Sequence, residues 1–243
     1  MAENEIIKHA KKVLTVFQST GMGIKDKVKD IVIEIVIIVF AVSISIWFHN
    51  WSESIHDHGE EIEFLTGLKQ DLKSDIDNME GSRDFYTETL QGIRYFLHSS
   101  KGGSLQKDSV LKYSEVFFGS TDLDPHVGRY ERLKSSGKFK IIQNKELLNN
   151  IIEFHETIIQ RIQVLDGKYY QHKEKLGAVV EQHVELSKDG SIRNAGQVLK
   201  RSDVRILLEL SGGLIINNIV GIHDRGIKKC RDIISQIDKE IHD

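Results

Sequence analysis

The stretch Ile31-Val-Ile-Glu34-Ile-Val-Ile-Ile-Val-Phe-Ala-Val-Ser-Ile-Ser-Ile-Trp-Phe48 decides how this chain is built. Glu34 is the only ionisable side chain in these eighteen residues. A helix rises about 1.5 Å per residue, so this segment is about 27 Å long and close to the thickness of a bilayer's hydrocarbon core. The pattern therefore predicts a transmembrane helix, which we place at residues 24–51.

The predicted span has the features of an uncleaved anchor and not those of a secretory signal. Its apolar run is long for a signal peptide, and it begins about thirty residues after Met1. The Phe48-His49-Asn50-Trp51 sequence that follows lacks the small residues of a cleavage site. We therefore expect the helix to remain in the membrane and to tie the rest of the chain to the lipid bilayer.

Lysine placement predicts the orientation of this span. No Lys or Arg follows the span until Lys69. Six lysines precede it: Lys8, Lys11, Lys12, Lys25, Lys27 and Lys29. Positively charged residues favour the cytoplasmic side of a membrane. In a Gram-negative cell the chain would then sit in the inner membrane, with its N-terminus in the cytoplasm and residues 52–243 in the periplasm.

Composition limits the other partners. The 243 residues carry a net charge of −3 and no broad basic field, so nucleic acid is not an expected partner. A single cysteine, Cys230, excludes an internal disulfide framework and a thiolate metal cluster. The residues after the span are numerous enough for one helical domain with a hydrophobic core.

Apolar residues after the span recur at helical spacing. The first series is separated by steps of three, four and seven: Ile55, Ile62, Leu65, Leu72, Ile76 and Met79. The alternation that strands require is not sustained. We therefore predict an all-α fold, in which a single N-terminal transmembrane helix is followed by an extracytoplasmic helical bundle. Residues 1–23 show a similar pattern and predict a cytoplasmic amphipathic helix.

A second apolar run, Leu214 to Ile222, lies near the end of the chain. It covers only nine residues and includes Asn217 and Asn218, so it is too short and too polar to cross a bilayer. We therefore expect one span and not two.

Turn and capping signals divide the bundle into segments. The first helix is expected to reach Leu97, and a second one to cover residues 109–118, followed by an irregular stretch to Gly128. A short helix over 129–137 should end at Gly137. Asn144 and Asp203 are the expected N-caps of two long helices, the first extending to about Leu186. Glycines in the last segment predict a break near Gly212 or a close approach of helices.

Glu34 is the most costly residue of the span, because a carboxylate within hydrocarbon needs a partner or a proton. It lies four residues after Asp30, so it can extend to the cytoplasmic interface or pair with Lys27 or Lys29. Alternatively it makes an interhelical contact in an oligomer, aided by small residues further along the span, Ala41, Ser43 and Ser45. A proton pathway would require several such groups on one route.

No catalytic, cofactor-binding or metal-ligating residue is predicted. His56 and His58 stand two apart, so on a helix they point about 200° away from each other and do not chelate together. The sequence has no His-Glu-x-x-His motif, no Gly-x-Ser-x-Gly motif and no phosphate-binding loop. We therefore do not expect an enzyme.

Cys230 and the tyrosines are interpreted mainly as core residues. Cys230 belongs to an isoleucine-rich helical segment, where a small apolar side chain packs well. Two interpretations stay open for the tyrosines, which either fill the helical core or line a ligand cleft between helices: Tyr86, Tyr95, Tyr169 and Tyr170.

Several motifs resemble an uncharacterised family of bacterial single-span membrane proteins, known only as a domain of unknown function. In that family a glutamate opens an Ile/Val-rich span that closes in Asn-Asn-Trp-x-Glu, which is similar to Glu34 and to Asn50, Trp51 and Glu53. Here His49 replaces the first asparagine, and Trp47 replaces a polar residue.

The resemblance continues after the span. Its segments are Leu68-Lys69-Gln70-Asp71-Leu72, Leu133-Lys134-Ser135-Ser136-Gly137, and Ile142 with residues 144–147. The resemblance covers most of the chain and implies an anchored helical domain. It implies no reaction and no catalytic residue.

These observations favour a membrane-anchored helical scaffold or interaction protein without catalytic activity. Its expected partners are the lipid bilayer and either further copies of itself, as a homo-oligomer, or another membrane or periplasmic protein. The alternative function is a periplasmic ligand-sensing bundle that signals through the span to a partner protein, because the residues before the span are too few for an output domain.

Overall fold

The computed structural model describes residues 11, 24–188 and 192–242 of the chain. Within them the structure is helical apart from turns, irregular segments and one isolated antiparallel bridge between Leu186 and Ile192. The predicted all-α fold is confirmed. The chain divides into two compact units, Met1–Glu60 and Glu61–Asp243, which are described separately. The amphipathic helix expected over residues 1–23 lies outside the described residues, apart from Lys11.

Helix α2 (Ile24–Ser100) contains the predicted span and all of the first bundle helix. It has no proline, and it ends three residues after the predicted end at Leu97. Gly102 follows with φ of 112°, a conformation that glycine adopts without strain. In the first unit the apolar side chains of this helix are exposed; Val36 and Phe40, for example, are 59% and 65% exposed. By length and composition this helix is apolar enough to cross a membrane.

A second helical stretch, Ser202–Ile241, passes the same test of length and composition. Some of its apolar side chains, however, are core residues of the second unit: Val204, Leu208, Ile215 and Ile219 are fully buried, whereas Ile206, Leu210 and Ile216 are more than half exposed. Such a helix is typical of a protein interior. The prediction that this segment does not cross a membrane agrees with this arrangement, because one apolar face of the segment packs in the core of the second unit.

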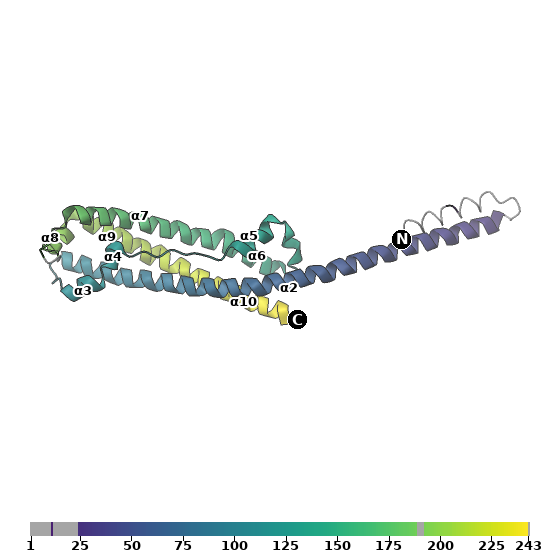
Figure 1. Ribbon diagram of the computed structural model, residues 1–243, viewed down its shortest axis with the longest axis horizontal. Coiled ribbons are helices and arrows are strands. Elements are labelled where there is room, and N and C mark those ends of the chain that lie inside the picture. Colours follow the sequence, from purple (N-terminus) through teal and green to yellow (C-terminus); the bar gives the residue numbers. More distant parts are fainter. Residues whose placement is uncertain (1–10, 12–23, 189–191, 243) are drawn as a thin grey trace. The chain divides into compact units, whose positions relative to one another are not determined.

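Three long helical stretches form the bundle of the second unit (Figure 1). The first is α2 from Glu61 onward. The second joins α6 (Lys145–Glu153), the π-helical turn η2 (Phe154–Ile159) and α7 (Gln160–His183). The third joins α9 (Ser202–Leu214), the π-helical turn η3 (Ile215–Ile219) and α10 (Val220–His242).

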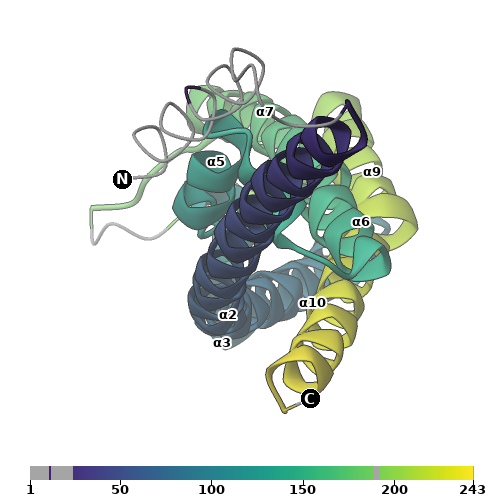
Figure 2. The same cartoon turned by 90° about the vertical axis from the view of Figure 1, so that its right-hand side faces the viewer.

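The view along the bundle places α7, α9 and α10 beside the second-unit part of α2 (Figure 2). The first and second stretches run in the same direction, and the third runs antiparallel to both (Figure 1).

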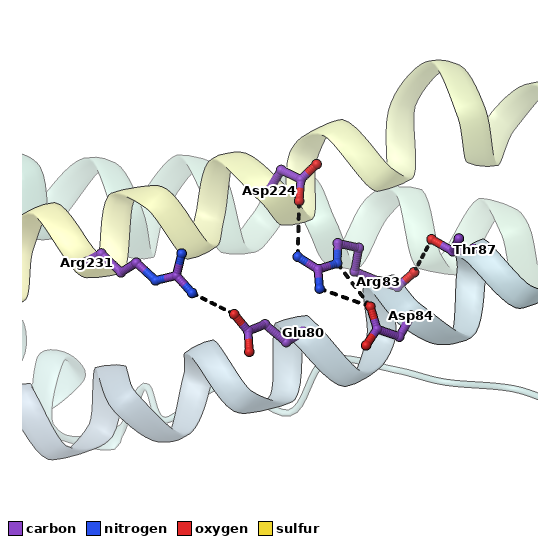
Figure 3. A network of polar contacts seen from close by, with 6 residues as sticks. All are labelled: Glu80, Arg83, Asp84, Thr87, Asp224 and Arg231. Carbon is purple, nitrogen blue, oxygen red and sulfur yellow. Dashed lines mark hydrogen bonds and ion pairs between the residues drawn. The ribbon is translucent and has the colours of Figure 1, made fainter.

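Ion pairs across the surface fix the antiparallel register of α2 and α10 (Figure 3). Arg231 donates to Glu80 at 2.7 Å, and Arg83 lies 3.5 Å from Asp224. Lys69 pairs with Asp238 further along the two helices. These side chains are half-exposed, and such pairs contribute about 0–1 kcal/mol each. They specify the alignment of the helices more than they stabilise it.

The segment between Gly119 and Val127 is an extended strap that runs back along α2. Thr121 is 3.1 Å from Ser82, and the His126 amide donates to Asp75 at 3.0 Å. Leu123 is only 6% exposed and packs into the core. The irregular stretch predicted here is therefore confirmed, and polar contacts with α2 satisfy part of its backbone.

The single helix predicted over residues 109–118 is only partly confirmed. Two short helices, α3 (Lys107–Lys112) and α4 (Glu115–Phe118), replace it. The hydroxyl of Ser114 donates to the carbonyl of Leu111 at 2.8 Å, a bond that competes with helix continuation. Tyr113 and Val116 also pack closely over Gly92 of α2, where a Cβ would lie 2.5 Å from a Val116 methyl. Long-range packing therefore bends the chain here.

Capping signals were partly correct. The Asn144 side chain accepts from the amides of Glu146 and Leu147, both at 3.0 Å, so the predicted N-cap of α6 is confirmed. Helix α5 (Gly128–Ser135) ends two residues before Gly137, which has φ of 68° and precedes the 3₁₀ helix η1 (Lys138–Ile141). The prediction that Asp203 caps α9 is wrong. The helix begins at Ser202, so Asp203 lies inside its first turn, and its carboxylate pairs with Arg201.

The break expected near Gly212 is also wrong, and the alternative of close helix packing is right. The chain passes from α9 through η3 into α10 as three successive helical segments. A Cβ at Gly212 would lie 3.3 Å from a methyl of Ile93, and one at Gly226 only 2.6 Å from the sulfur of Met79. Glycine at these two positions allows α2 to approach the third stretch.

Candidate functional site

An apolar cavity of about 370 Å³ opens at the end of the bundle where α2 stops. Helices α2, α3, α4 and α7 contribute to it, together with α8 (Ala195–Lys200) and the turn before it. Its lining comprises Phe96, Leu105, Val110, Ser114, Phe117, Phe118, Val180, Glu181, Val184, Leu186, Ile192, Ala195, Val198 and Leu199. A cavity of this size and composition is typical of a binding site.

The cavity has a buried floor and an exposed apolar rim. Phe96, Val198 and Leu199 are at most 5% exposed and belong to the core. Phe118 and Leu186, in contrast, are both 64% exposed although they line the cavity. Large apolar side chains gathered at the edge of an open cavity mark a surface that another molecule covers.

Asn194 holds the turn on which part of the rim is built. Its side-chain oxygen accepts from the Glu185 amide at 2.9 Å, and its amide nitrogen donates to the His183 carbonyl at 2.8 Å. The Arg193 amide also donates to the Glu185 carbonyl at 2.8 Å. These bonds join the end of α7 to the start of α8 and position Leu186 and Ile192 against each other. Hydrogen bonds therefore hold the side of the rim that carries Leu186 and Ile192.

The polar groups of this cavity do not form a catalytic arrangement. Ser114 already donates its hydroxyl to the Leu111 carbonyl. Among the described residues that line the cavity, Glu181 alone is ionisable. General acid–base or nucleophilic chemistry requires at least two converging polar groups, so the geometry favours binding of an apolar molecule or segment.

A second polar group lies inside the bundle, where all three helical stretches meet. The Tyr86 hydroxyl donates to Asp166 at 2.8 Å, and the Nε2 atom of His223 lies 3.5 Å from the same carboxylate oxygen. His223 is fully buried, and neither of its ring nitrogens makes a hydrogen bond. Burial, with the nearby Asp166 carboxylate, raises the pKa of Tyr86. The group joins the three helical stretches as an internal contact.

His155 is a buried histidine in the π-helical turn η2. Its ring stacks on that of Tyr130, with centroids 4.3 Å apart and an angle of 7° between the planes. Neither ring nitrogen has a hydrogen-bond partner. Burial lowers the pKa of His155 to about 4, although the Glu156 carboxylate acts in the opposite direction. The ring is therefore neutral at pH 7 and behaves as an aromatic core residue.

Asp75 and His126 form a partly buried pair between α2 and the strap. Nδ1 of His126 lies 2.8 Å from the Asp75 carboxylate. Burial raises the pKa of Asp75, while the hydrogen bond with Asp75 raises the pKa of His126. The pair joins the strap to α2.

Glu34 is 7% exposed, whereas its neighbours Ile33 and Ile35 are about half exposed, at 46% and 51%. The hydroxyl of Ser45, one of the small residues further along the span, donates to the Ala41 carbonyl at 2.9 Å and is thereby satisfied within the helix. Whether Glu34 contacts a second span or the interface stays a prediction.

The histidines after the span do not come together as a pair. His56 lies 3.6 Å from Glu60, its partner one turn later, and with Asp57 these residues place three ligand-type atoms within 4.8 Å of one another. His58 is not part of the group. Because His56 and Asp57 are exposed, the group is an ordinary solvated helix face and carries no metal assignment.

The tyrosines and Cys230 are mainly core residues. Tyr86 and Tyr169 are buried and make an edge-to-face contact at 5.1 Å, whereas Tyr170 is half-exposed. Tyr95 does not line the cavity, and its hydroxyl accepts from the Gln106 amide at 2.9 Å. Cys230 is fully buried, and burial raises its pKa, so the prediction of a small core residue is confirmed.

Sequence patterns missed the apolar cavity, because its residues come from six separate segments. One local signal was present: Leu186 and Ile192 flank Lys188-Asp189-Gly190, a sequence with an Asp-Gly turn signal, and this pattern is typical of two apolar residues facing each other across a hairpin. Residues 189–191 of that turn lie outside the described residues. The convergence of the remaining lining residues depends on helix packing and has no signature in sequence.

No curated protein and no solved structure matches this chain. One family model does match, and it covers residues 34–207, from Glu34 in the predicted span through the cavity-lining helices to part of α9. This match extends over more than half of the chain and agrees with the expected membership in a domain of unknown function. The chain therefore belongs to a family of unknown function, DUF6090.

Proposed function

We propose that this protein is a membrane-anchored interaction protein, whose helical bundle acts as a scaffold that docks a partner protein at the open end cavity. The bundle itself carries out no chemistry. Its anchor is the apolar part of α2, with the N-terminus in the cytoplasm and the bundle in the periplasm. The lysines before the span and their absence immediately after it support this orientation.

The cavity and its exposed rim carry this proposal. Phe118 and Leu186 leave most of their apolar surface in water, which is costly unless a partner covers it. The part of the rim that carries Leu186 and Ile192 is held by the Asn194 hydrogen bonds, so a partner would not have to order that part. Open, rigid and apolar surfaces of this kind are typical of protein interfaces built around a central pocket.

The docking proposal predicts site-specific crosslinking. With a photo-crosslinking amino acid at Leu186 in the full chain, we expect adducts of one or a few defined masses in native membranes. The double variant Phe118→Asp with Ala195→Phe, which places a charge on the rim and fills the cavity, should reduce the adduct at least about fivefold. Quantitative immunoblotting and mass spectrometry of the adducts provide the measurement.

The matched control for crosslinking is Ile206, which is 55% exposed on α9 but does not line the cavity. A probe at this position should yield no adduct of the same mass, and Ile206→Asp should leave the Leu186 adducts unchanged. Equal adducts from both positions would show that the cavity is not the docking site. A strictly monomeric chain without any adduct would contradict the scaffold function.

The proposed orientation predicts the behaviour of terminal reporters. Alkaline phosphatase fused after Asp243 should be active, because this enzyme requires the oxidising periplasm, whereas green fluorescent protein at the same place should be dark when exported through the general secretory route. The same reporters placed before the span should show the opposite pattern. A C-terminal fusion active only in the cytoplasm would overturn the periplasmic assignment.

Ligand sensing is the second candidate function, and the cavity volume favours it. About 370 Å³ is within the range of small-molecule sites, about 300–1,000 Å³. A small apolar ligand would then fill the cavity in place of a partner's side chains. Phe118 and Leu186, however, would remain largely exposed around such a ligand, which is why we favour a protein partner.

A further inference from the structure

We propose that the end cavity receives an amphipathic helix of the partner protein, and that a lysine or arginine next to the apolar face of that helix pairs with Glu181. This inference rests on the proposed docking function and specifies the chemistry of the partner. It assigns Glu181 as the residue that selects a basic segment over an acidic one.

The size of the cavity and its rim favour a polypeptide. The cavity has the volume of about a dozen water molecules at about 30 Å³ each, enough for more than one large side chain. Helices present such side chains at i and i+3 or i+4, and they dock in apolar grooves in this way. The body of the helix would also cover Phe118 and Leu186, the apolar surface outside the cavity.

The charge around the cavity favours a basic segment. Glu181 is the ionisable residue among the described lining residues, so an anionic group at the same place would meet a carboxylate of like charge. Glu181 lies in the last turn of α7, which ends at His183. Backbone carbonyls at a helix C-terminus carry partial negative charge, so they also favour a nearby cation. Carboxylate and helix terminus therefore both select against an acidic partner.

The side chain of Glu181 is available for such a contact. It is exposed, and none of the ion pairs found between described residues includes it. The other polar side chain of the cavity, that of Ser114, already donates to a backbone carbonyl and offers no selection by charge. The lysine or arginine of the partner would therefore pair with Glu181 at the edge of the cavity. This pair would be partly shielded from water once the helix covers the rim.

Labelled peptides test this assignment on the full chain in lipid nanodiscs. Three helical peptides share an apolar face of leucine and phenylalanine and differ only at two flanking positions, which are Lys, Gln or Glu. Fluorescence anisotropy gives their dissociation constants. At low ionic strength we expect the Lys peptide to bind about fivefold to tenfold more tightly than the Glu peptide, with a ratio that falls as salt is added.

Substitutions locate the source of the preference. Glu181→Gln should reduce the Lys-to-Glu ratio to less than about twofold, while the Gln peptide keeps its affinity. Glu209→Gln, on an exposed position of α9 outside the cavity, should leave the ratio unchanged. Ala195→Phe should weaken all three peptides, because it fills the cavity. Circular dichroism of each variant confirms that it is folded.

The outcomes separate the inference from the docking function. Equal binding of the three peptides, or a preference that persists in Glu181→Gln, would overturn the role of Glu181 and leave docking intact. A different outcome is that none of the three peptides binds, while a fluorescent alkyl-chain probe binds saturably and Ala195→Phe abolishes this binding. That outcome would overturn the role of Glu181 and the docking function, and it would identify a small-ligand site. No binding of any probe would also overturn both.

Discussion

Replacing Gly226 with leucine should destabilise the bundle by about 3 kcal/mol, near the upper end of typical overpacking costs. Gly226 lies on α10, facing α2 and the second helical stretch. Even a Cβ there would come within 2.6 Å of the Met79 sulfur and 3.4 Å of atoms in Ile158 and Ile162. All three neighbours are fully buried, so a larger side chain must displace core residues. Chemical denaturation of the full chain in detergent measures the change.

Gly221 is the matched control, because it lies on the same helix and has no neighbouring atom within 4 Å of the position that a Cβ would occupy. Gly221→Leu should be neutral or stabilise the protein by about 0.5–1 kcal/mol through helix propensity. Adding Met79→Ala to Gly226→Leu should restore part of the loss by making room. A Gly226→Leu protein as stable as the Gly221→Leu protein would contradict the close approach of α2 and α10.

Lowering the pH from about 6.5 to 4 should cost the folded state about 3 kcal/mol through His155 alone. Its folded pKa is about 4, whereas an unfolded histidine titrates near 6.5. Between these values the unfolded chain binds the additional proton, so stability rises with pH across the window and is lost as the pH falls through it. The stabilisation is fully present above the unfolded value and absent below the folded one.

His155→Phe isolates this contribution. Phenylalanine keeps the stacking on Tyr130 and removes two ring nitrogens that have no hydrogen-bond partner. We expect the variant to be more stable than the wild type at about pH 4.5 and the difference to shrink as the pH rises to about 7. Urea denaturation at several pH values measures it. A difference that does not depend on pH would show that His155 is accessible to water.

His126 provides a comparison with the opposite sign. Its pKa is raised by the hydrogen bond with Asp75, so its contribution is present at low pH and is lost as the pH rises through the raised value. His126→Gln should therefore cost more stability below about pH 6 than at higher pH, where the histidine is neutral in both states. The side chain is 47% exposed, and solvent makes this effect smaller than that of His155.

Local patterns in the sequence were sufficient for much of the fold. The eighteen residues from Ile31, of which only Glu34 is ionisable, predict a membrane span, because hydrocarbon can hold only a segment with its backbone bonds closed internally. Asn144 marked its helix start, because a cap needs only the amides two and three residues away. These features depend on residues close together in sequence, so they can be read without knowledge of the fold.

Tertiary packing decided the remaining features. Ser109 to Phe118 carries a plausible helix pattern, yet contacts with Gly92 of α2 divide it into two short helices. The turns η2 and η3 add i→i+5 hydrogen bonds that alter which side chains face the core, among them His155. Burial of His155, and with it the low pKa, follows from neighbours that the local sequence does not contain.

The sequence by itself determined the apolar span, the all-helical architecture and several of the helix ends, because each depends on the hydrophobicity and capping of a short segment. Only the tertiary structure decided the candidate site. Phe96, Phe118, Val180 and Ala195 are distant in sequence and form one cavity because α2, α4, α7 and α8 meet at one end of the bundle. The free energy that brings them together comes from burying core residues elsewhere in the bundle, and that cooperation is a property of the whole fold.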